Sequence, residues 1–471
     1  MPLGPFDRRK KRTRCRHCAS SHLKCSGNRP CSHCEKRAIF CVYPDPGEIN
    51  RPIEIDRGSQ KTIASYARQN VANSKLTRAP KVDATYFYFY YFDLFLQNNN
   101  FGQHGVFAID TKDMARSVDA AGFLKDAILS LGAMAAVRLK STDGPTRPEN
   151  YRFALTSYTH SVAGLRTALE NNAEKSQLRL NVMWTTLILG LFELMTDSSG
   201  QGWIQHLVHG TSKALIASGP AACRFGPGQR FFTEVKIFEV CRSVVFNEPS
   251  FLTQAEWAHL SMDLQSKTEG KKPHSLDALL HITVRCSSLL VRAKNFIGTA
   301  DGSTPELDTS LAHELAMEGF CEREALRTWS ERNSELLRGS PESDASSQSQ
   351  EYDFASLAMI FHAATSVYLS GVFDYDIVHW NDLGTLVSTL NEDEIQMYLG
   401  TILGMSQLVL NQAKISPLLL LFPLRVAGAR SRERWQQDMI INLLARIEGT
   451  FSVAGAFVHD LQGLWSVRGW S

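Results

Sequence analysis

The chain has 471 residues, of which 44% are hydrophobic and 21% charged, and its formal net charge is +2. This length allows two or three domains and exceeds the needs of one small module. No uninterrupted apolar stretch reaches the roughly 18 residues that a membrane-spanning helix needs, so we expect no membrane among its partners.

The first 14 residues form a basic arm with the run Arg8, Arg9, Lys10, Lys11 and Arg12. The arm has no apolar segment of the kind that a secretory signal requires. Residues 1–43 hold eleven lysines and arginines against two acids, so this segment carries +9 and the remainder carries −7. A solvated charge run is the plain alternative. Because a cysteine cluster follows directly, we interpret residues 1–14 as a DNA-backbone contact and a nuclear localisation signal, the latter at residues 8–12.

Six cysteines follow with the spacing C-x2-C-x6-C-x5-C-x2-C-x6-C: Cys15, Cys18, Cys25, Cys31, Cys34 and Cys41. A C-x2-C pair can hold one tetrahedral zinc, because the intervening turn places both sulfurs on one side. Six ligands are too few for two separate four-coordinate sites, whereas two zinc ions that share two thiolates use all six. No position is then left for water, which favours a structural site over a catalytic one. A disulfide cluster is the alternative, and it would need an oxidising compartment.

This spacing, with Pro30 in the central loop, closely resembles the fungal binuclear zinc-cluster (Zn2Cys6) DNA-binding domain. The resemblance implies a DNA-binding domain at residues 15–43 that holds two Zn2+ ions. It also implies the ligand sets, in which Cys15 and Cys31 bridge the ions. Cys18 and Cys25 would complete one site, and Cys34 and Cys41 the other.

In that family the first helix of the cluster enters the major groove, so residues 19–24 are expected to face DNA. Many relatives carry two adjacent basic residues where this chain has Ser21 and His22, and neutral His22 offers one donor and one acceptor instead of a full charge. The stretch 19–21 is similar to the clusters of fungal polyketide-pathway (aflatoxin-type) regulators, which are associated with TCG-type half-sites. We therefore expect a short CG-containing half-site that is contacted by His22 and Lys24. Phosphate contacts, which position without reading sequence, are expected from Arg14, Arg16, Arg29, Lys36 and Arg37.

Residues 44–84 are polar and begin with a Pro-Asp-Pro-Gly turn signal, so we interpret them as a linker. Family members that dimerise often carry a coiled coil here, with apolar residues at the a and d positions of the heptads. The apolar residues of this stretch do not keep that period, and no zipper is predicted. A homodimer formed through the following domain stays open.

Residues 85–471 are predicted to form one large helical domain, because no convincing strand alternation occurs there. Apolar residues at three- and four-residue steps predict a helix over 151–169. The seven aromatics of 86–92 are too dense for a surface, so we expect them in a buried core helix or strand. Further helices are expected at 123–139, 182–195, 231–246, 357–372, 393–409 and within 435–465, with loops at 141–148, 299–305 and 339–350. The fold class is therefore mainly all-α.

Several segments of this domain resemble, in the same order, the fungal-specific transcription-factor domain that follows zinc clusters in many regulators. These segments are residues 90–101, 125–136, 185–196, 202–206, 218–220 and 423–430. The resemblance implies a regulatory domain that receives signals or partners and has no known reaction.

No catalytic motif is evident in this domain, and we predict that the chain is not an enzyme. His206 and His209 could share a helix face, but the H-E-x-x-H motif and a third ligand are absent. Residues 226–230 are rich in glycine but lack the Lys-Ser/Thr of a phosphate loop, so they predict a turn. Four further cysteines are expected to be buried thiols: Cys223, Cys241, Cys286 and Cys321.

The sequence thus predicts a nuclear, sequence-specific DNA-binding regulator of genes transcribed by RNA polymerase II. Its expected partners are double-stranded DNA and the transcription machinery or its co-regulators, and the resemblance makes a secondary-metabolite gene cluster a plausible setting. The alternative is a zinc-cluster co-regulator or scaffold that does not read DNA alone, because Ser21 and His22 are neutral and a coiled coil is missing. A third hypothesis, an enzyme that the zinc cluster targets to DNA, is not supported by any catalytic motif.

Overall fold

The structure, a computed structural model, describes residues 15, 18, 25–28, 30–37, 41–43, 84–102, 122–140, 144–170, 176–199, 210–268, 275–299, 305–334 and 348–469. The chain forms two compact units, Met1–Pro80 and Lys81–Ser471. We call the first unit the head and the second the body. Among the described residues of the head, one short helix is present, α2 (Ser32–Lys36).

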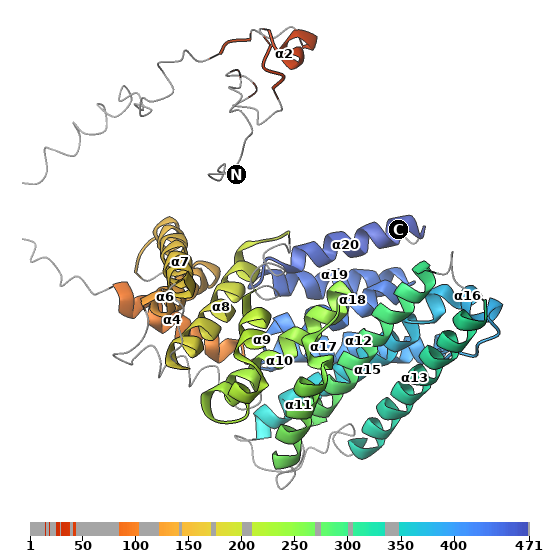
Figure 1. The fold of residues 1–471 in the computed structure, drawn as a ribbon. Coiled ribbons are helices and arrows are strands. Elements are labelled where there is room, and N and C mark those ends of the chain that lie inside the picture. Colours follow the sequence, from red (N-terminus) through yellow and green to blue (C-terminus); the bar gives the residue numbers. More distant parts are fainter. Residues whose placement is uncertain are drawn as a thin grey trace, which may run out of the picture. The chain divides into compact units, whose positions relative to one another are not determined.

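The described residues of the body are mainly helical (Figure 1), and no strand occurs among them apart from one isolated bridge between Asn100 and Ile415. The predicted all-α fold is therefore confirmed. The first half contains α4 (Ala84–Asn98), α6 (Gly122–Arg138), α7 (Arg147–Glu170), α8 (Ser176–Thr196), α9 (Lys213–Ser218), η3 (Pro220–Cys223), α10 (Gly226–Phe246), η4 (Phe251–Thr253) and α11 (Ala255–Thr268). The second half contains α12 (Ser275–Thr299), α13 (Pro305–Arg332), α15 (Gln348–Gly371), η5 (Asp374–Asp376), α16 (Ile377–Asp382), α17 (Glu392–Gln412), η6 (Pro417–Leu420), α18 (Leu421–Arg430), α19 (Arg434–Glu448) and α20 (Ala454–Val467).

Helix α6 organises one end of the body, where it packs against α4, α7 and α8 (Figure 1). All its residues from 127 to 137 are buried. Alanine and glycine make this possible, because small side chains let neighbouring backbones approach on several sides. The closest approach is at Gly132, where an added Cβ would overlap the carbonyl oxygen of Tyr88 on α4.

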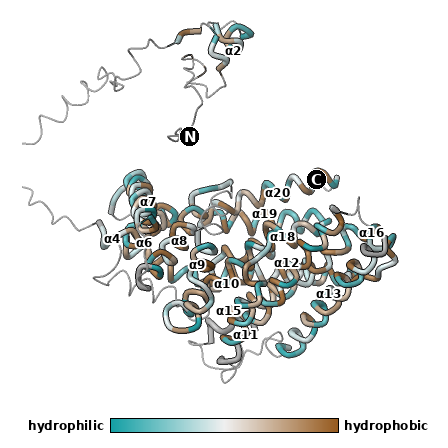
Figure 2. Tube along the Cα trace, in the orientation of Figure 1, coloured by the Kyte–Doolittle hydropathy of each residue, from teal (hydrophilic) through white to brown (hydrophobic). Residues whose placement is uncertain are grey.

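Helix α15 has the same role in the second half of the body, since α12, α13, α17 and α18 all pack against it. The segment Asp353–Asp382, which contains most of α15, has the length and composition of a membrane span. However, 83% of its most apolar window is buried inside the body. Figure 2 colours the chain by hydropathy and shows hydrophobic stretches within the helices of the body. A helix buried on every side is apolar all round, so packing within the body explains this composition.

The beginning of the body is bonded to a segment near its end. The backbone N–H of Asn100 donates to the carbonyl oxygen of Lys414 at 2.8 Å. The backbone N–H of Ser416 donates to the carbonyl oxygen of Asn100 at 2.9 Å. The Ser416 hydroxyl donates to Oδ1 of Asn99 at 3.2 Å. These contacts clamp the end of α4 to the turn between α17 and η6.

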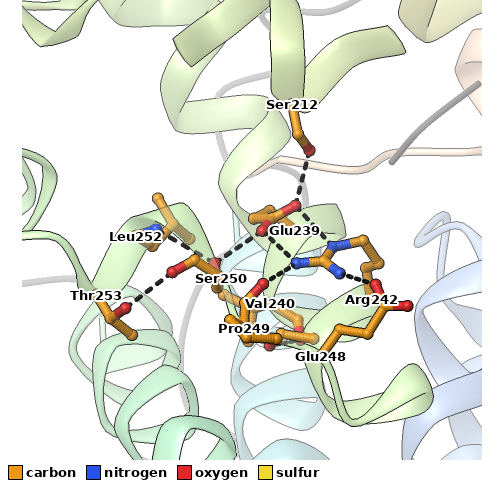
Figure 3. A network of polar contacts seen from close by, with 10 residues as sticks. Ser212, Glu239, Val240, Arg242, Glu248, Pro249, Ser250, Leu252 and Thr253 are labelled. Atoms are coloured by element: carbon orange, nitrogen blue, oxygen red, sulfur yellow. Dashed lines mark hydrogen bonds and ion pairs between the residues drawn. The ribbon is translucent and has the colours of Figure 1, made fainter. Parts of the chain in front are cut away.

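A buried ion pair holds the chain where α10 ends (Figure 3). Arg242 and Glu239 have side chains only 6% and 2% exposed, and Arg242 also donates to Glu248 at 2.8 Å. The hydroxyls of Ser212 and Ser250 each donate to the Glu239 carboxylate at 2.8 Å. Because its partners satisfy both charges, the pair can be buried, and it fixes the turn between α10 and η4.

Two local predictions for the body are wrong. Residues 226–230 begin α10 instead of forming a turn, and Pro227 is tolerated there because the first N–H groups of a helix have no intrahelical acceptor. The aromatic run is helical but only half buried. Tyr88 and Phe92 lie on the inner face of α4 at 2% and 1% exposure, whereas Tyr86 and Tyr90 on the outer face are 74% and 62% exposed.

The predicted buried state of the body cysteines is confirmed for Cys223, Cys241 and Cys286. The prediction is wrong for Cys321, which is exposed. Helix α13 is amphipathic, and its buried residues, such as Ala312, Leu315 and Glu322, lie along one face of the helix. Cys321 lies outside this face. The predicted stretch 435–465 consists of two helices, α19 and α20, separated by a turn at 449–453.

We predict that Gly132→Ala destabilises the full chain by about 1–3 kcal/mol, because the methyl group forces α4 and α6 apart. Gly404→Ala is the matched control, since Gly404 also lies within a helix and has nothing within 4 Å of an added Cβ. Alanine there should stabilise by about 0.5–1 kcal/mol through its helix propensity. Urea unfolding followed by circular dichroism measures both changes. Equal effects of the two substitutions would contradict the close packing of α4 on α6.

Candidate metal centre

The six head cysteines converge in space although they span 27 residues of sequence. Each of two groups, Cys15, Cys18, Cys25, Cys31 and Cys15, Cys31, Cys34, Cys41, has its sulfur atoms within 4.8 Å of one another. Cys15 and Cys31 belong to both groups. Four of the six are fully buried, and Cys25 and Cys41 are half-buried.

The sulfur separations fit zinc coordination. Cys15 lies 3.8 Å from Cys31 and 3.7 Å from Cys34, and Cys18 lies 3.6 Å from Cys31, each measured between Sγ atoms. Two sulfurs bound to one tetrahedral zinc at about 2.3 Å stand roughly 3.8 Å apart. A disulfide would instead bring them to about 2.05 Å, and all six cysteines are free thiols. The disulfide alternative is therefore wrong.

The backbone of the head is shaped to present these sulfurs. Cys31 is the N-cap of α2, and its Sγ accepts from the backbone N–H of Cys34 at 3.4 Å. The first half repeats the arrangement, because the N–H of Cys18 donates to Sγ of Cys15 at 3.4 Å. The N–H of Cys31 also donates to Sγ of Cys41 at 3.2 Å. Such N–H groups favour thiolates, the form that binds metal.

The proton affinities of the thiols show why the cluster needs a cation. Burial raises the pKa of Cys18 to about 12, whereas the N–H of Cys34 lowers the pKa of Cys31 to about 6. Burial also raises the pKa of Cys34. Six neighbouring thiolates cannot coexist at neutral pH without positive charge between them, and sulfur ligands in tetrahedral sets are typical of Zn2+.

Tyr43 is a functional candidate that the sequence analysis missed. Its hydroxyl lies 3.1 Å from Sγ of Cys25 and 2.9 Å from the carbonyl oxygen of Asn28. This contact lowers the pKa of Cys25 and raises that of Tyr43. Because a metal-bound thiolate and a carbonyl oxygen can both only accept, the single hydroxyl proton of Tyr43 is shared between Cys25 and Asn28. Tyr43 therefore ties an outer ligand to the loop between the two halves of the cluster, and its position two residues after Cys41 was the available signal.

Of the residues predicted to contact DNA, the structure describes Lys36 and Arg37, which are exposed at the end of α2. The others lie outside the described residues: Arg14, Arg16, His22, Lys24 and Arg29. The same holds for the predicted localisation signal, Arg8 to Arg12, and for His206 and His209 in the body. These assignments stay predictions.

Comparison with known proteins assigns both units. Residues 13–48 match the fungal Zn(2)-Cys(6) binuclear cluster domain, and residues 86–469 match the fungal specific transcription factor domain. An uncharacterized transcriptional regulatory protein of Schizosaccharomyces pombe is 44% identical over 48 residues, which cover 10% of this chain and 8% of that relative. No solved structure matches the chain. With its six clustered thiols, the cluster domain binds two Zn2+ ions.

We predict that the full chain carries two Zn2+ ions and that Cys31→Ser retains fewer than one, because Cys31 belongs to both groups of sulfurs. Elemental analysis of the purified protein gives the ratio. Cys321→Ser, which changes an exposed thiol of the body, should keep both ions. Two ions retained by Cys31→Ser would exclude a shared ligand at this position.

We predict that Tyr43→Phe weakens zinc binding about ten-fold, as expected for loss of a hydrogen bond to a metal ligand. Competition with a chromogenic chelator measures the affinity. Tyr86→Phe, an exposed tyrosine of α4, is the control and should not change it. An unchanged affinity for Tyr43→Phe would mean that its hydroxyl only holds the loop.

Proposed function

This chain belongs to the family of the fungal specific transcription factor domain and is a regulator of transcription, and we propose that its zinc cluster binds a short CG-containing half-site in double-stranded DNA. The proposal rests on one observation above all: the cluster of six thiols lies within a segment, residues 1–43, that carries +9. Such a charge attracts phosphate by releasing counterions. The remaining residues carry −7 and are repelled by the duplex.

We assign the contacts within this head by their chemistry. His22 and Lys24 would contact base edges, and Arg14, Arg16, Arg29, Lys36 and Arg37 would contact phosphates. The exposure of Lys36 and Arg37 beside the N-capped helix α2 supports their part of this assignment. Cys15 and Cys31 would bridge the two zinc ions, because both belong to each of the two groups of four sulfurs.

The proposed organisation follows the composition of the chain. Residues 1–14 would be the basic arm with a nuclear localisation signal, 15–43 the DNA-binding domain, 44–84 a linker and 85–471 the regulatory domain. The protein would then act in the nucleus on genes transcribed by RNA polymerase II, with co-regulators or a second copy bound through the body. A secondary-metabolite gene cluster as target rests on the similarity of residues 19–21 to aflatoxin-type regulators.

A co-regulator that uses the cluster without reading sequence is the second candidate. The neutral pair Ser21 and His22 favours it, because relatives place basic residues there. Such a protein would still bind DNA through charge, and its specificity would come from a partner bound to the body.

We predict that the zinc-loaded full chain enriches one short CG-containing motif from randomised duplex DNA, and that His22→Ala reduces discrimination at one base pair by about 1–3 kcal/mol. Lys36→Ala is the matched comparison. As a phosphate contact, it should weaken binding to all sequences alike and lower the salt dependence by about one charge.

Chelation should abolish the enrichment together with folding of the head. Retention of DNA without an enriched motif, lost steeply as salt rises, would instead support the co-regulator.

A further inference from the structure

A cavity of about 440 Å³, open to solvent, lies in the body where the second half of α6, the first turns of α7 and the end of α8 meet. Met134 and Val137 of α6, both buried, form apolar walls together with Tyr151 of α7. Arg138 and Arg147 also line it. Small-molecule sites typically have volumes of about 300–1,000 Å³ and combine apolar walls with a few charged groups. The cavity has both properties.

Arg138 is held in place by the protein itself. Its Nη2 donates to the carbonyl oxygen of Met195 and to the hydroxyl of Ser452. Ser452 also donates to the Met195 carbonyl at 3.0 Å. Among the described residues, no acceptor pairs with Nη1, and Nε is buried without one. A guanidinium that is anchored through one nitrogen and unpaired at the others is preorganised for an oxyanion.

The charges around the cavity are unbalanced. Burial lowers the pKa of Arg138, the positive charge of Arg147 adds to this effect, and the Glu448 carboxylate opposes it. Arg147 is exposed and forms no ion pair with the described residues. The adjacent Glu149 is already engaged, since its carboxylate accepts from the N–H and hydroxyl of Thr146 at 2.8 Å. Two guanidinium groups therefore line one cavity, and no carboxylate is among the described residues that line it.

We propose that this cavity binds a small organic anion, with its oxyanion between Arg138 and Arg147 and its aliphatic or aromatic part against Met134, Val137 and Tyr151. A carboxylate suits the planar guanidinium groups, and the apolar part replaces water on the apolar walls. Arg138 joins α6 to the end of α8 and to the turn before α20. A bound anion stabilises this junction of helices. The body thereby has a site through which a small acidic metabolite changes the stability of the body.

The test uses the zinc-loaded full chain and two fluorescent probes with the same apolar body. One is the anion 1-anilinonaphthalene-8-sulfonate, and the other is the neutral N-phenyl-1-naphthylamine. We expect saturable binding of one sulfonate per chain. Arg147→Gln should weaken this binding roughly ten-fold, the size of one charge-assisted contact, and leave the affinity for the neutral probe unchanged.

Two further variants locate the binding. Arg332→Gln, which removes an exposed arginine at the end of α13 and outside the cavity, should bind both probes like the parent chain. Thr196→Trp should weaken both probes, because Thr196 lines the cavity and the indole fills it. Circular dichroism confirms that each variant is folded. Equal sulfonate affinity in the parent and Arg147→Gln, or no saturable binding at all, would overturn the proposal.

Discussion

Two tetrahedral zinc ions have eight ligand positions, and the head provides six clustered sulfur atoms, so two of the thiolates would serve both ions. This constraint determines the arrangement of the described residues of the head. The described residues that are buried there are cysteines, with Tyr43 packed against them. A unit of this size has almost no apolar core, and the metal cluster takes its place. The direction of α2, and with it the exposure of Lys36 and Arg37, follows from where Cys31 and Cys34 are held.

The body depends on the opposite principle, because helices stabilise it through close apolar contact. Helix α6 shows the extreme case, in which small residues allow neighbours on several sides and one glycine cannot be replaced without moving a backbone. The buried charges of Arg242 and Glu239 are satisfied by each other and by neighbouring hydroxyls. Arg138 departs from this pattern, since it is anchored through one nitrogen beside a cavity that its neighbours leave open.

The metal centre was predictable from sequence because its ligands follow a spacing that few other structures require. The all-α fold was predictable for a similar reason, since helical periodicity repeats over long stretches. Single contacts were not. Tyr43 lies 18 positions after Cys25, and its place two residues after Cys41 was the one signal for their contact. Arg138 meets Ser452 across 314 residues, so the cavity has no sequence signature. The exposed faces of α4 and α13 do not follow from residue type alone, because the position of a residue around the helix decides its burial. Tyr86 is exposed and Tyr88 is buried on α4, and Cys321 is exposed and Glu322 is buried on α13.

The clamp between Asn99 and Ser416 has a consequence for biosynthesis. These two residues are 317 positions apart, and translation at about 5–20 residues per second needs roughly 15–60 s to cover that interval. During this time the first helix of the body lacks its final partner, whereas all six cysteines of the head have already left the ribosome. The two units therefore mature in sequence. The head can take up zinc while the body is still being made, and the body closes only when its last third emerges.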